Sequence, residues 1–339
     1  GEVATAGDVT GDVEVHLRAG DGDAHGHARD PAYDRVILHV VLFPPDERRM
    51  TRGGGGREIP MLALLPLLHR ALEEFAADEA VEVLANRAVA RLPDELCALS
   101  MPELLELLHK HAAARWRQKV HFARLRVQRL GWTAACHQTA LEILGYRFNR
   151  APMLRIAGSR PLDAWARWEV AADAVFEAEA GAWSLQGVRP ANHPRTRLRQ
   201  YSAWAQARPD WPERVRSLAA ALTPIAPRAG DPAVLSTREV RRRKRFSALR
   251  ARWGDEVCGG AVGGTRLDNI MCDGLLPLAA AETGNDLEWA WYHWFAGDLP
   301  PMLTKGLREL GFFDGREQPA CHGAAQGVLG WLLEREAGY

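Results

Sequence analysis

The sequence predicts an α+β protein with a small N-terminal β-sheet followed by a larger, mostly helical body. Residues 12–18 alternate strictly between polar and apolar side chains, which is the period of a half-buried strand. Residues 36–43 form a continuous apolar run, typical of a strand covered on both faces. From about residue 66 onward, the apolar residues recur at helical spacing. We therefore expect a β-rich part over residues 1–60 and a mainly helical domain over residues 61–339.

The elements of the β-rich part follow one another closely. In the first strand the polar residues are Asp12, Glu14, His16 and Arg18, and the apolar residues are Val13, Val15 and Leu17. We expect the apolar side of this strand to face the core. Glycines at 53–56 predict a turn, and residues 58–65 predict either a strand or the start of a helix. The chain begins at Gly1 rather than Met, in sequence typical of mid-domain, so we expect part of the sheet to be missing.

The helical body carries clear end signals. Ser100, with a proline and a glutamate in the turn that follows, predicts a helix N-cap. Gly145 predicts a helix C-terminus. Pro190 and Pro194 predict a loop that leads into a helix near residue 195. The 12 tryptophans stand at helical spacing, which favours a place in the core over a platform for stacking bases.

Composition limits the classes of function. Lysine and arginine together number 43, as do aspartate and glutamate, so bulk charge gives no argument for a nucleic-acid or membrane partner. No apolar run reaches the ~18 residues that a membrane span needs. The five cysteines never form a CxxC pair, which predicts reduced thiols in a cytoplasm and argues against a cysteine zinc site.

Histidines concentrate near the N-terminal end, where His16, His25, His27 and His39 fall within 24 residues. Glu14 and His16 are two residues apart on the first predicted strand and therefore share a face. His25 and His27 lie between the two predicted strands, and an antiparallel or folded-back return would bring them to that face. We predict a divalent metal site of Glu14, His16, His25 and His27, for Mg²⁺ or Mn²⁺ with Zn²⁺ as the third option.

Each member of this cluster also has a structural alternative. His39 stands inside an apolar strand, so we assign it to the core as a hydrogen-bonded histidine rather than to the metal. Glu14 and His16 are equally compatible with a solvated strand face, and His25 and His27 with an exposed loop.

Basic residues gather in three stretches, at 115–129, 189–199 and 238–252. Such runs neutralise phosphates in nucleic-acid complexes. The candidate nucleic-acid contacts are Arg189, Asn192, Arg195, Arg241, Arg242, Arg243, Lys244 and Arg245. A solvated helix face is the alternative, favoured for the first stretch and of equal weight for residues 241–245. Asn192, between two prolines, fits a structural corner as well as a site.

Several segments together resemble the bacterial domain-of-unknown-function 2851 family. They are, in order, GDVEVH at 11–16, HGHARDPAYDRVILHVV at 25–41, LGYRFN at 144–149, SRPL at 159–162 and RPANHPRTRLRQ at 189–200. The resemblance extends over most of the chain and implies no activity. Where relatives tend to have Trp before the histidine pair, this sequence has Gly22.

The order of strands also resembles the plan of PD-(D/E)XK nucleases. On that resemblance, Glu14 binds the metal ion, His16 takes the place of the usual Lys near the attacking water, and Asp30 and Tyr33 lie on the next short helix. The catalytic candidates are therefore Glu14, His16, Asp30 and Tyr33. An upstream Asp would supply a second carboxylate, so the resemblance implies that this chain binds metal poorly and is inactive unless extended. Asp30 and Tyr33 are alternatively a turn cap and a packing residue.

Two classes of function are compatible with these observations. The first is a metal-dependent phosphodiesterase or nuclease that acts on nucleic acid. The alternative is a non-catalytic nucleic-acid or protein interaction module whose His/carboxylate site is structural.

Overall fold

The computed structural model describes residues 10–16, 35–42, 51–52, 58–64, 94–146, 148–226, 229–231, 234–313 and 316–337. The chain forms two compact units, Gly1–Ala76 and Ala77–Tyr339. A small sheet in the first unit and a mostly helical second unit confirm the predicted α+β class. The helical pattern expected between residues 66 and 93 lies outside the described residues.

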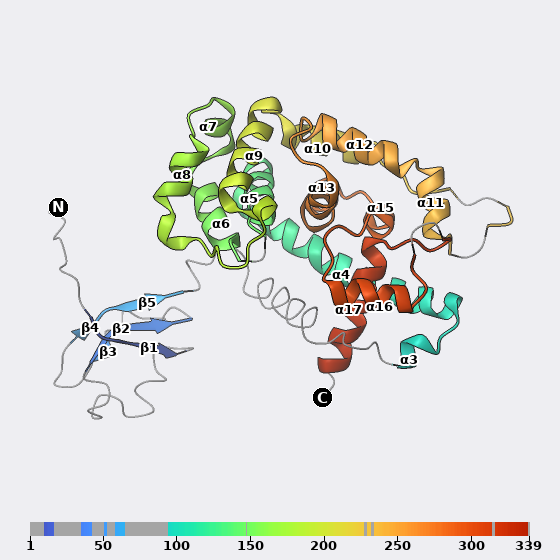
Figure 1. Cartoon of the computed structure of the whole chain (residues 1–339), viewed down its shortest axis with the longest axis horizontal. Coiled ribbons are helices and arrows are strands. Elements are labelled where there is room, and N and C mark those ends of the chain that lie inside the picture. Colours follow the sequence, from blue (N-terminus) through green and yellow to red (C-terminus); the bar gives the residue numbers. More distant parts are fainter. Residues whose placement is uncertain are drawn as a thin grey trace. The chain divides into compact units, whose positions relative to one another are not determined.

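The N-terminal unit contains a three-stranded parallel sheet (Figure 1). Its strands, in spatial order, are β1 (Asp12–His16), β2 (Val36–Val41) and β5 (Met61–Ala63). A separate antiparallel pair is formed by β3 (Thr51–Arg52) and β4 (Glu58–Ile59). β1 and β2 run parallel, so β2 itself is not an antiparallel return; the segment with His25 and His27, which we expected to return antiparallel or folded back, lies outside the described residues. Parallel neighbours need a longer crossover connection, which residues 17–35 are long enough to make.

The register of β1 against β2 decides which side of β1 faces the interior. Glu14 is opposite His39 and His16 is opposite Val41, and both of these β2 residues are 0% exposed. The intervening Val13 and Val15 are 53% and 67% exposed. The expected orientation is therefore inverted, because the polar side of β1 meets a buried histidine while the valines face outward.

The helical unit is built around the 30-residue helix α4, which packs against α17 and α14. Its α-helices are α3 (Asp94–Cys97), α4 (Met101–Leu130), α5 (Trp132–Leu144), α6 (Arg150–Ser159), α7 (Leu162–Ala166), α8 (Ala172–Ala178), α9 (Pro194–Ala207), α10 (Trp211–Ala220), α11 (Thr237–Arg243), α12 (Phe246–Glu256), α13 (Gly264–Ile270), α14 (Leu276–Thr283), α15 (Glu288–His293), α16 (Pro301–Glu309) and α17 (His322–Ala337). Short 3₁₀ turns lie at Ala180–Ala182 and Pro190–Asn192, and a π-helical turn lies at Met271–Leu275.

Local end signals are confirmed in part. Ser100 precedes α4, and its backbone N–H donates to Glu103 Oε2 at 3.0 Å. Gly145 follows α5 as expected, but it keeps right-handed angles with φ −64°, and Tyr146 takes the left-handed conformation with φ 56°. Glycine is required at 145 for a different reason: a Cβ there would lie 2.5 Å from the carbonyl oxygen of Asn149.

Tryptophans fill much of the core of the helical unit, as the sequence predicts, but Trp168 is an exception and is 75% exposed. Six are fully buried: Trp165, Trp204, Trp211, Trp253, Trp291 and Trp294. Several reach a backbone acceptor with the indole N–H; Trp204 Nε1, for example, donates to the Val257 oxygen at 2.8 Å. Such a partner offsets the cost of burying the polar end of the ring.

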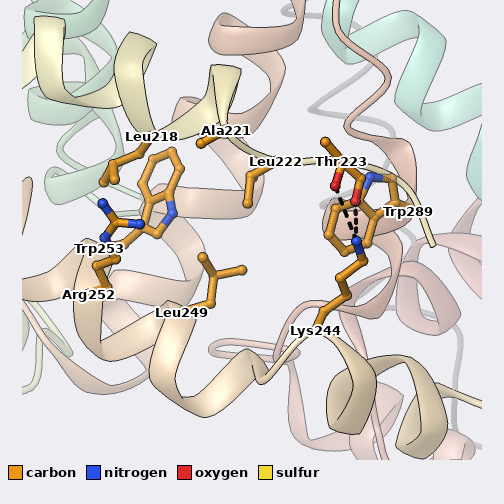
Figure 2. Close-up of a pocket in the computed structure, with 9 residues that line it drawn as sticks. All are labelled: Leu218, Ala221, Leu222, Thr223, Lys244, Leu249, Arg252, Trp253 and Trp289. Carbon is orange, nitrogen blue, oxygen red and sulfur yellow. Dashed lines mark hydrogen bonds between the residues drawn. The ribbon is translucent and has the colours of Figure 1, made fainter. Parts of the chain in front are cut away.

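A groove in the helical unit is lined mainly by apolar side chains from α10, α12 and the turn after α10 (Figure 2). Its volume is about 230 Å³. Lys244 lies at one end of it and donates to the backbone oxygens of Thr223 and Pro224, at 2.5 and 3.1 Å. Ligand pockets usually exceed about 300 Å³, so this groove is small for a substrate site.

Candidate metal centre

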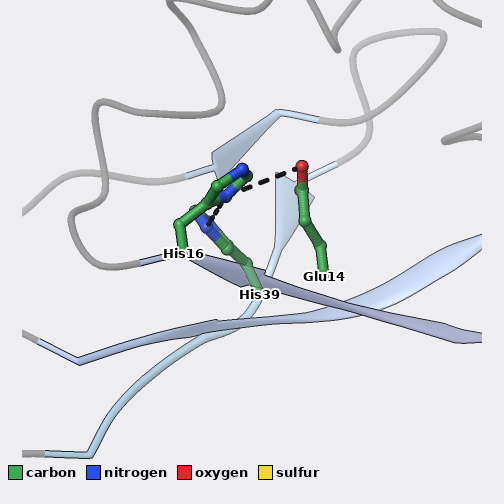
Figure 3. Close-up of side chains that lie close together, drawn as sticks. All are labelled: Glu14, His16 and His39. Carbon is green, nitrogen blue, oxygen red and sulfur yellow. Dashed lines mark hydrogen bonds and ion pairs between the residues drawn. The ribbon is translucent and has the colours of Figure 1, made fainter. Parts of the chain in front are cut away.

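Three potential metal ligands converge on one face of the N-terminal sheet (Figure 3). Glu14 and His16 come from β1, and His39 comes from β2. His16 Nδ1 lies 3.0 Å from His39 Nε2 and 3.7 Å from Glu14 Oε1. All three donor atoms lie within 4.8 Å of one another. The parallel register explains the convergence, because residues directly opposite each other project from the same face of a sheet.

The donor spacing suits a small divalent ion. Nitrogen and oxygen donors around a tetrahedral zinc ion lie about 3.3 Å apart, as two donors at roughly 2.0–2.1 Å from the metal require. The two printed distances of 3.0 and 3.7 Å lie on either side of that value. Two imidazoles and one carboxylate favour Zn²⁺ or Mn²⁺ over Mg²⁺, which prefers oxygen donors and keeps several waters.

Burial is graded across the cluster. The His39 residue is 0% exposed, whereas the side chains of Glu14 and His16 are 9% and 15% exposed. The inner side of the cluster is therefore shielded, which strengthens electrostatic interactions there. The outer side retains contact with solvent, which a water ligand or a substrate requires. Without an ion, His16 and His39 share a hydrogen bond of 3.0 Å, and Glu14 lies beside His16 at 3.7 Å.

The structure brings together two of the four predicted metal ligands, Glu14 and His16. The others, His25 and His27, and the catalytic candidates Asp30 and Tyr33 lie outside the described residues, so their roles stay predictions. The sequence analysis missed His39 as a ligand candidate. It is a core residue, as we expected, and also the third member of the cluster. One signal for it existed: it is the single polar residue of its strand.

Arg241 and Lys244, two of the predicted nucleic-acid contacts, hold backbone groups of the helical unit together. The Arg241 guanidinium donates to three carbonyl oxygens at 2.8–3.0 Å, which belong to His293, Trp294 and Ala320. Lys244 also lies over the ring of Trp289, 5.1 Å from its centroid. Both cations therefore have partners within the fold.

The neighbouring Arg242 and Arg243 form ion pairs. Both bond to the carboxylate of Glu239, and Arg243 also bonds to Asp231 at 2.5 and 2.8 Å. The pKa of Glu239 is held at about 2 by these hydrogen bonds, so its charge persists at neutral pH. Arg245 is exposed, at a left-handed backbone position ahead of α12. Local carboxylates thus offset part of the positive charge in this run.

In the second basic stretch, Arg189 is exposed and Arg195 forms an ion pair with Glu177. Asn192 ends the 3₁₀ turn between the two prolines. Its Oδ1 accepts hydrogen bonds from arginine side chains of α9 and α13. Asn192 is therefore an organising residue inside the helical unit as well as a candidate contact.

The fold and this cluster define an α+β protein with a candidate His/Glu metal centre in its N-terminal unit. The family model described as a protein of unknown function (DUF2851) matches residues 5–178, just over half of the chain. The chain therefore belongs to the domain-of-unknown-function 2851 family, which confirms the family resemblance found in the sequence; of the segments that carried it, the one at 189–200 lies beyond the matched residues.

Comparison with curated proteins and with solved structures gives no match. The comparisons therefore lend no support to the nuclease resemblance. Within the part of the chain that the structure describes, no helix is both long enough and apolar enough to cross a membrane.

Proposed function

We propose that the N-terminal unit binds one divalent metal ion through Glu14, His16 and His39 and hydrolyses phosphodiesters of nucleic acid. The convergence of two imidazole nitrogens and a carboxylate oxygen within 4.8 Å is the observation that supports the proposal. A divalent ion there supplies Lewis acidity for the attack of water on phosphorus. The partly exposed Glu14 and His16 side chains leave the outer side of the site accessible.

The choice of nucleic acid as substrate depends on the exposed cations of the helical unit. Arg189 and Arg245 are exposed, and Arg242 is 69% exposed although it pairs with Glu239. These groups are available to a phosphate backbone. We also propose that the protein is bacterial and cytoplasmic. The five free cysteines fit the reducing conditions of a cytoplasm.

A structural ion is the second candidate, and the complete burial of His39 favours it. Structural metal sites are closed by protein ligands, whereas catalytic sites keep an open position. If the ion is structural, a chelator should lower the melting temperature of the protein. An ion present at 100 times its Kd stabilises the folded state by about 2.7 kcal/mol.

Metal binding is tested first, by calorimetric titration of the metal-stripped full chain with Zn²⁺, Mn²⁺ and Mg²⁺. We expect one site in the wild type and at least about tenfold weaker binding in Glu14→Gln and His39→Gln, since even outer-sphere partners contribute that much. Asp12→Asn is the matched control, because Asp12 lies on the same strand with its side chain 55% exposed. Absence of binding by the wild type would refute the whole proposal.

Cleavage is tested next, with DNA and RNA oligonucleotides and the ion that binds. The expected hydrolysis rests on the three ligands Glu14, His16 and His39, and not on the nuclease plan with its upstream Asp. Hydrolysis that disappears in Glu14→Gln and survives in Asp12→Asn supports the catalytic assignment. Hydrolysis that persists in Glu14→Gln contradicts it. Metal binding without hydrolysis, together with a chelator-sensitive melting temperature, selects the structural ion.

A further inference from the structure

Two arginines from different helices meet at one amide oxygen in the helical unit. Arg197 of α9 donates from Nη2 to Asn192 Oδ1 at 2.7 Å, and Arg266 of α13 donates from Nη2 to the same oxygen at 3.0 Å. Because both nitrogens bond to one atom, they lie at most about 5.7 Å apart. Two positive charges at this separation repel each other unless an anion lies between or beside them.

The described surroundings do not balance these charges. Arg197 is 8% exposed and Arg266 is 4% exposed. Arg197 bonds to two neutral acceptors, Asn192 Oδ1 and Gln200 Oε1, the latter at 2.6 Å. The one carboxylate bonded to the pair in the described residues is Asp298, whose Oδ2 is 3.3 Å from Arg266 Nη2. Asp273 also attracts Arg266 electrostatically, but it bonds to Lys119 at 3.0 Å. Two buried cations are thus bonded to a single carboxylate, and an uncompensated buried charge is strongly unfavourable.

Two further observations point the same way. The Nε atoms of both Arg197 and Arg266 are buried and have no hydrogen-bond partner among the described residues. Burial, and to a smaller extent the charge of Arg266, lowers the pKa of Arg197 to about 10. The fold therefore disfavours the charged form of this guanidinium. Such unfavourable arrangements are enriched at functional sites.

The side chains around the pair hold it in position. Gln200 donates from Nε2 to the Ala261 oxygen at 2.8 Å, which fixes its own oxygen toward Arg197. The ring of Tyr146 lies under the guanidinium of Arg266, 4.8 Å from centroid to Cζ, and is itself 37% exposed. A planar guanidinium held by such neighbours presents its donors in a fixed fork.

We propose that Arg197 and Arg266 bind a phosphoryl group of a ligand beside Asn192. A phosphoryl group carries enough charge to neutralise both cations, and its several oxygens accept from two forks at once. A carboxylate offers only two oxygens and one negative charge, and Asp298 already supplies one such group to Arg266. The site lies wholly within the helical unit and does not depend on the metal centre.

The test uses the full chain in chelator, so that failure of the metal proposal leaves it unaffected. Calorimetric titrations use inorganic phosphate, a nucleoside monophosphate and a dinucleotide with one phosphodiester. Sodium acetate is the carboxylate control, and chloride keeps the ionic strength constant. Saturable binding of any phosphoryl probe, with at least about tenfold weaker binding in Arg197→Gln and Arg266→Gln, is the expected result. The three probes distinguish a free anion, a monoester and a diester as the source.

Arg199→Gln is the matched control, because Arg199 lies on the same helix, is exposed, and pairs with Asp173. It removes the same charge and should bind each probe as the wild type does. Arg197→Lys keeps the positive charge but loses the paired N–H donors of the guanidinium. If Arg197→Gln does not fold, Arg197→Lys is compared with the wild type instead. The proposal is overturned if the wild type binds no phosphoryl probe, if acetate binds equally well, or if Arg199→Gln weakens binding as much as Arg197→Gln.

Discussion

Acidification toward pH 5 should strongly destabilise the helical unit, because burial lowers the pKa of four of its histidines, His109 among them, to about 3 or 4. His137, His293 and His322 are 2%, 6% and 5% exposed. Burial lowers the pKa of His137 and of His322 to about 4 and that of His293 to about 3, from the ordinary value near 6.5. His137 also uses both ring nitrogens, at 2.5 Å from Tyr201 Oη and at 2.8 Å from the Arg160 oxygen.

The sign and size follow from proton linkage. Between pH 6.5 and pH 4 the unfolded chain binds protons at these histidines and the folded chain does not, so stability falls as the pH falls. Above pH 6.5 the contribution is fully present. At pH 5 each histidine costs about 2 kcal/mol relative to pH 7, as shifts of this size imply. Together with His109, whose pKa burial also lowers to about 4, the four cost about 8 kcal/mol, which is comparable to the whole stability of a typical domain.

Urea unfolding followed by far-ultraviolet circular dichroism, at steps between pH 7.5 and pH 5, measures this loss. The limiting slope for four protons is about 5 kcal/mol per pH unit. His137→Gln removes one titrating group and should reduce the slope by about one quarter, whatever it does to stability at pH 7.5. An unfolding free energy that stays constant within about 1 kcal/mol from pH 7 to pH 5 would show that the reasoning is wrong.

Three substitutions test packing and ion pairing in the helical unit by the same urea assay. Glu142→Ala should lower the free energy of unfolding by about 3–5 kcal/mol, because it removes the carboxylate 2.8 Å from Arg126, whose side chain is 6% exposed. A loss below about 1 kcal/mol would contradict this reasoning. Glu179→Ala, which breaks a surface pair with Arg155, should cost at most about 1 kcal/mol. Gly327→Ala should cost about 1–3 kcal/mol, since its Cβ would lie 2.5 Å from the Leu108 oxygen; wild-type stability would argue against that contact between α4 and α17.

Two of the three residues of the candidate metal centre, Glu14 and His16, were predicted from the sequence, whereas the third, His39, was not predicted as a ligand. The spacing of Glu14 and His16 placed them on one face of a strand, which is correct. His39 was assigned to the core from its apolar neighbours, and it is buried. That assignment could not reveal the contact with His16, because the contact depends on the parallel register of two strands. The basic run at residues 241–245 shows the same limit, since partners such as Asp231 and His293 are distant in sequence.

By itself, the sequence determined the local features of this protein. Hydrophobic periodicity placed the first two strands and the helical body, and the residues at helix ends placed the start of α4 and the end of α5. These features depend on neighbours a few residues apart. Tertiary structure alone decided that the polar side of β1 turns inward to His39 and that Arg197 and Arg266 meet at Asn192. Such contacts depend on strand register and helix packing, which the periodicity of a single segment does not specify.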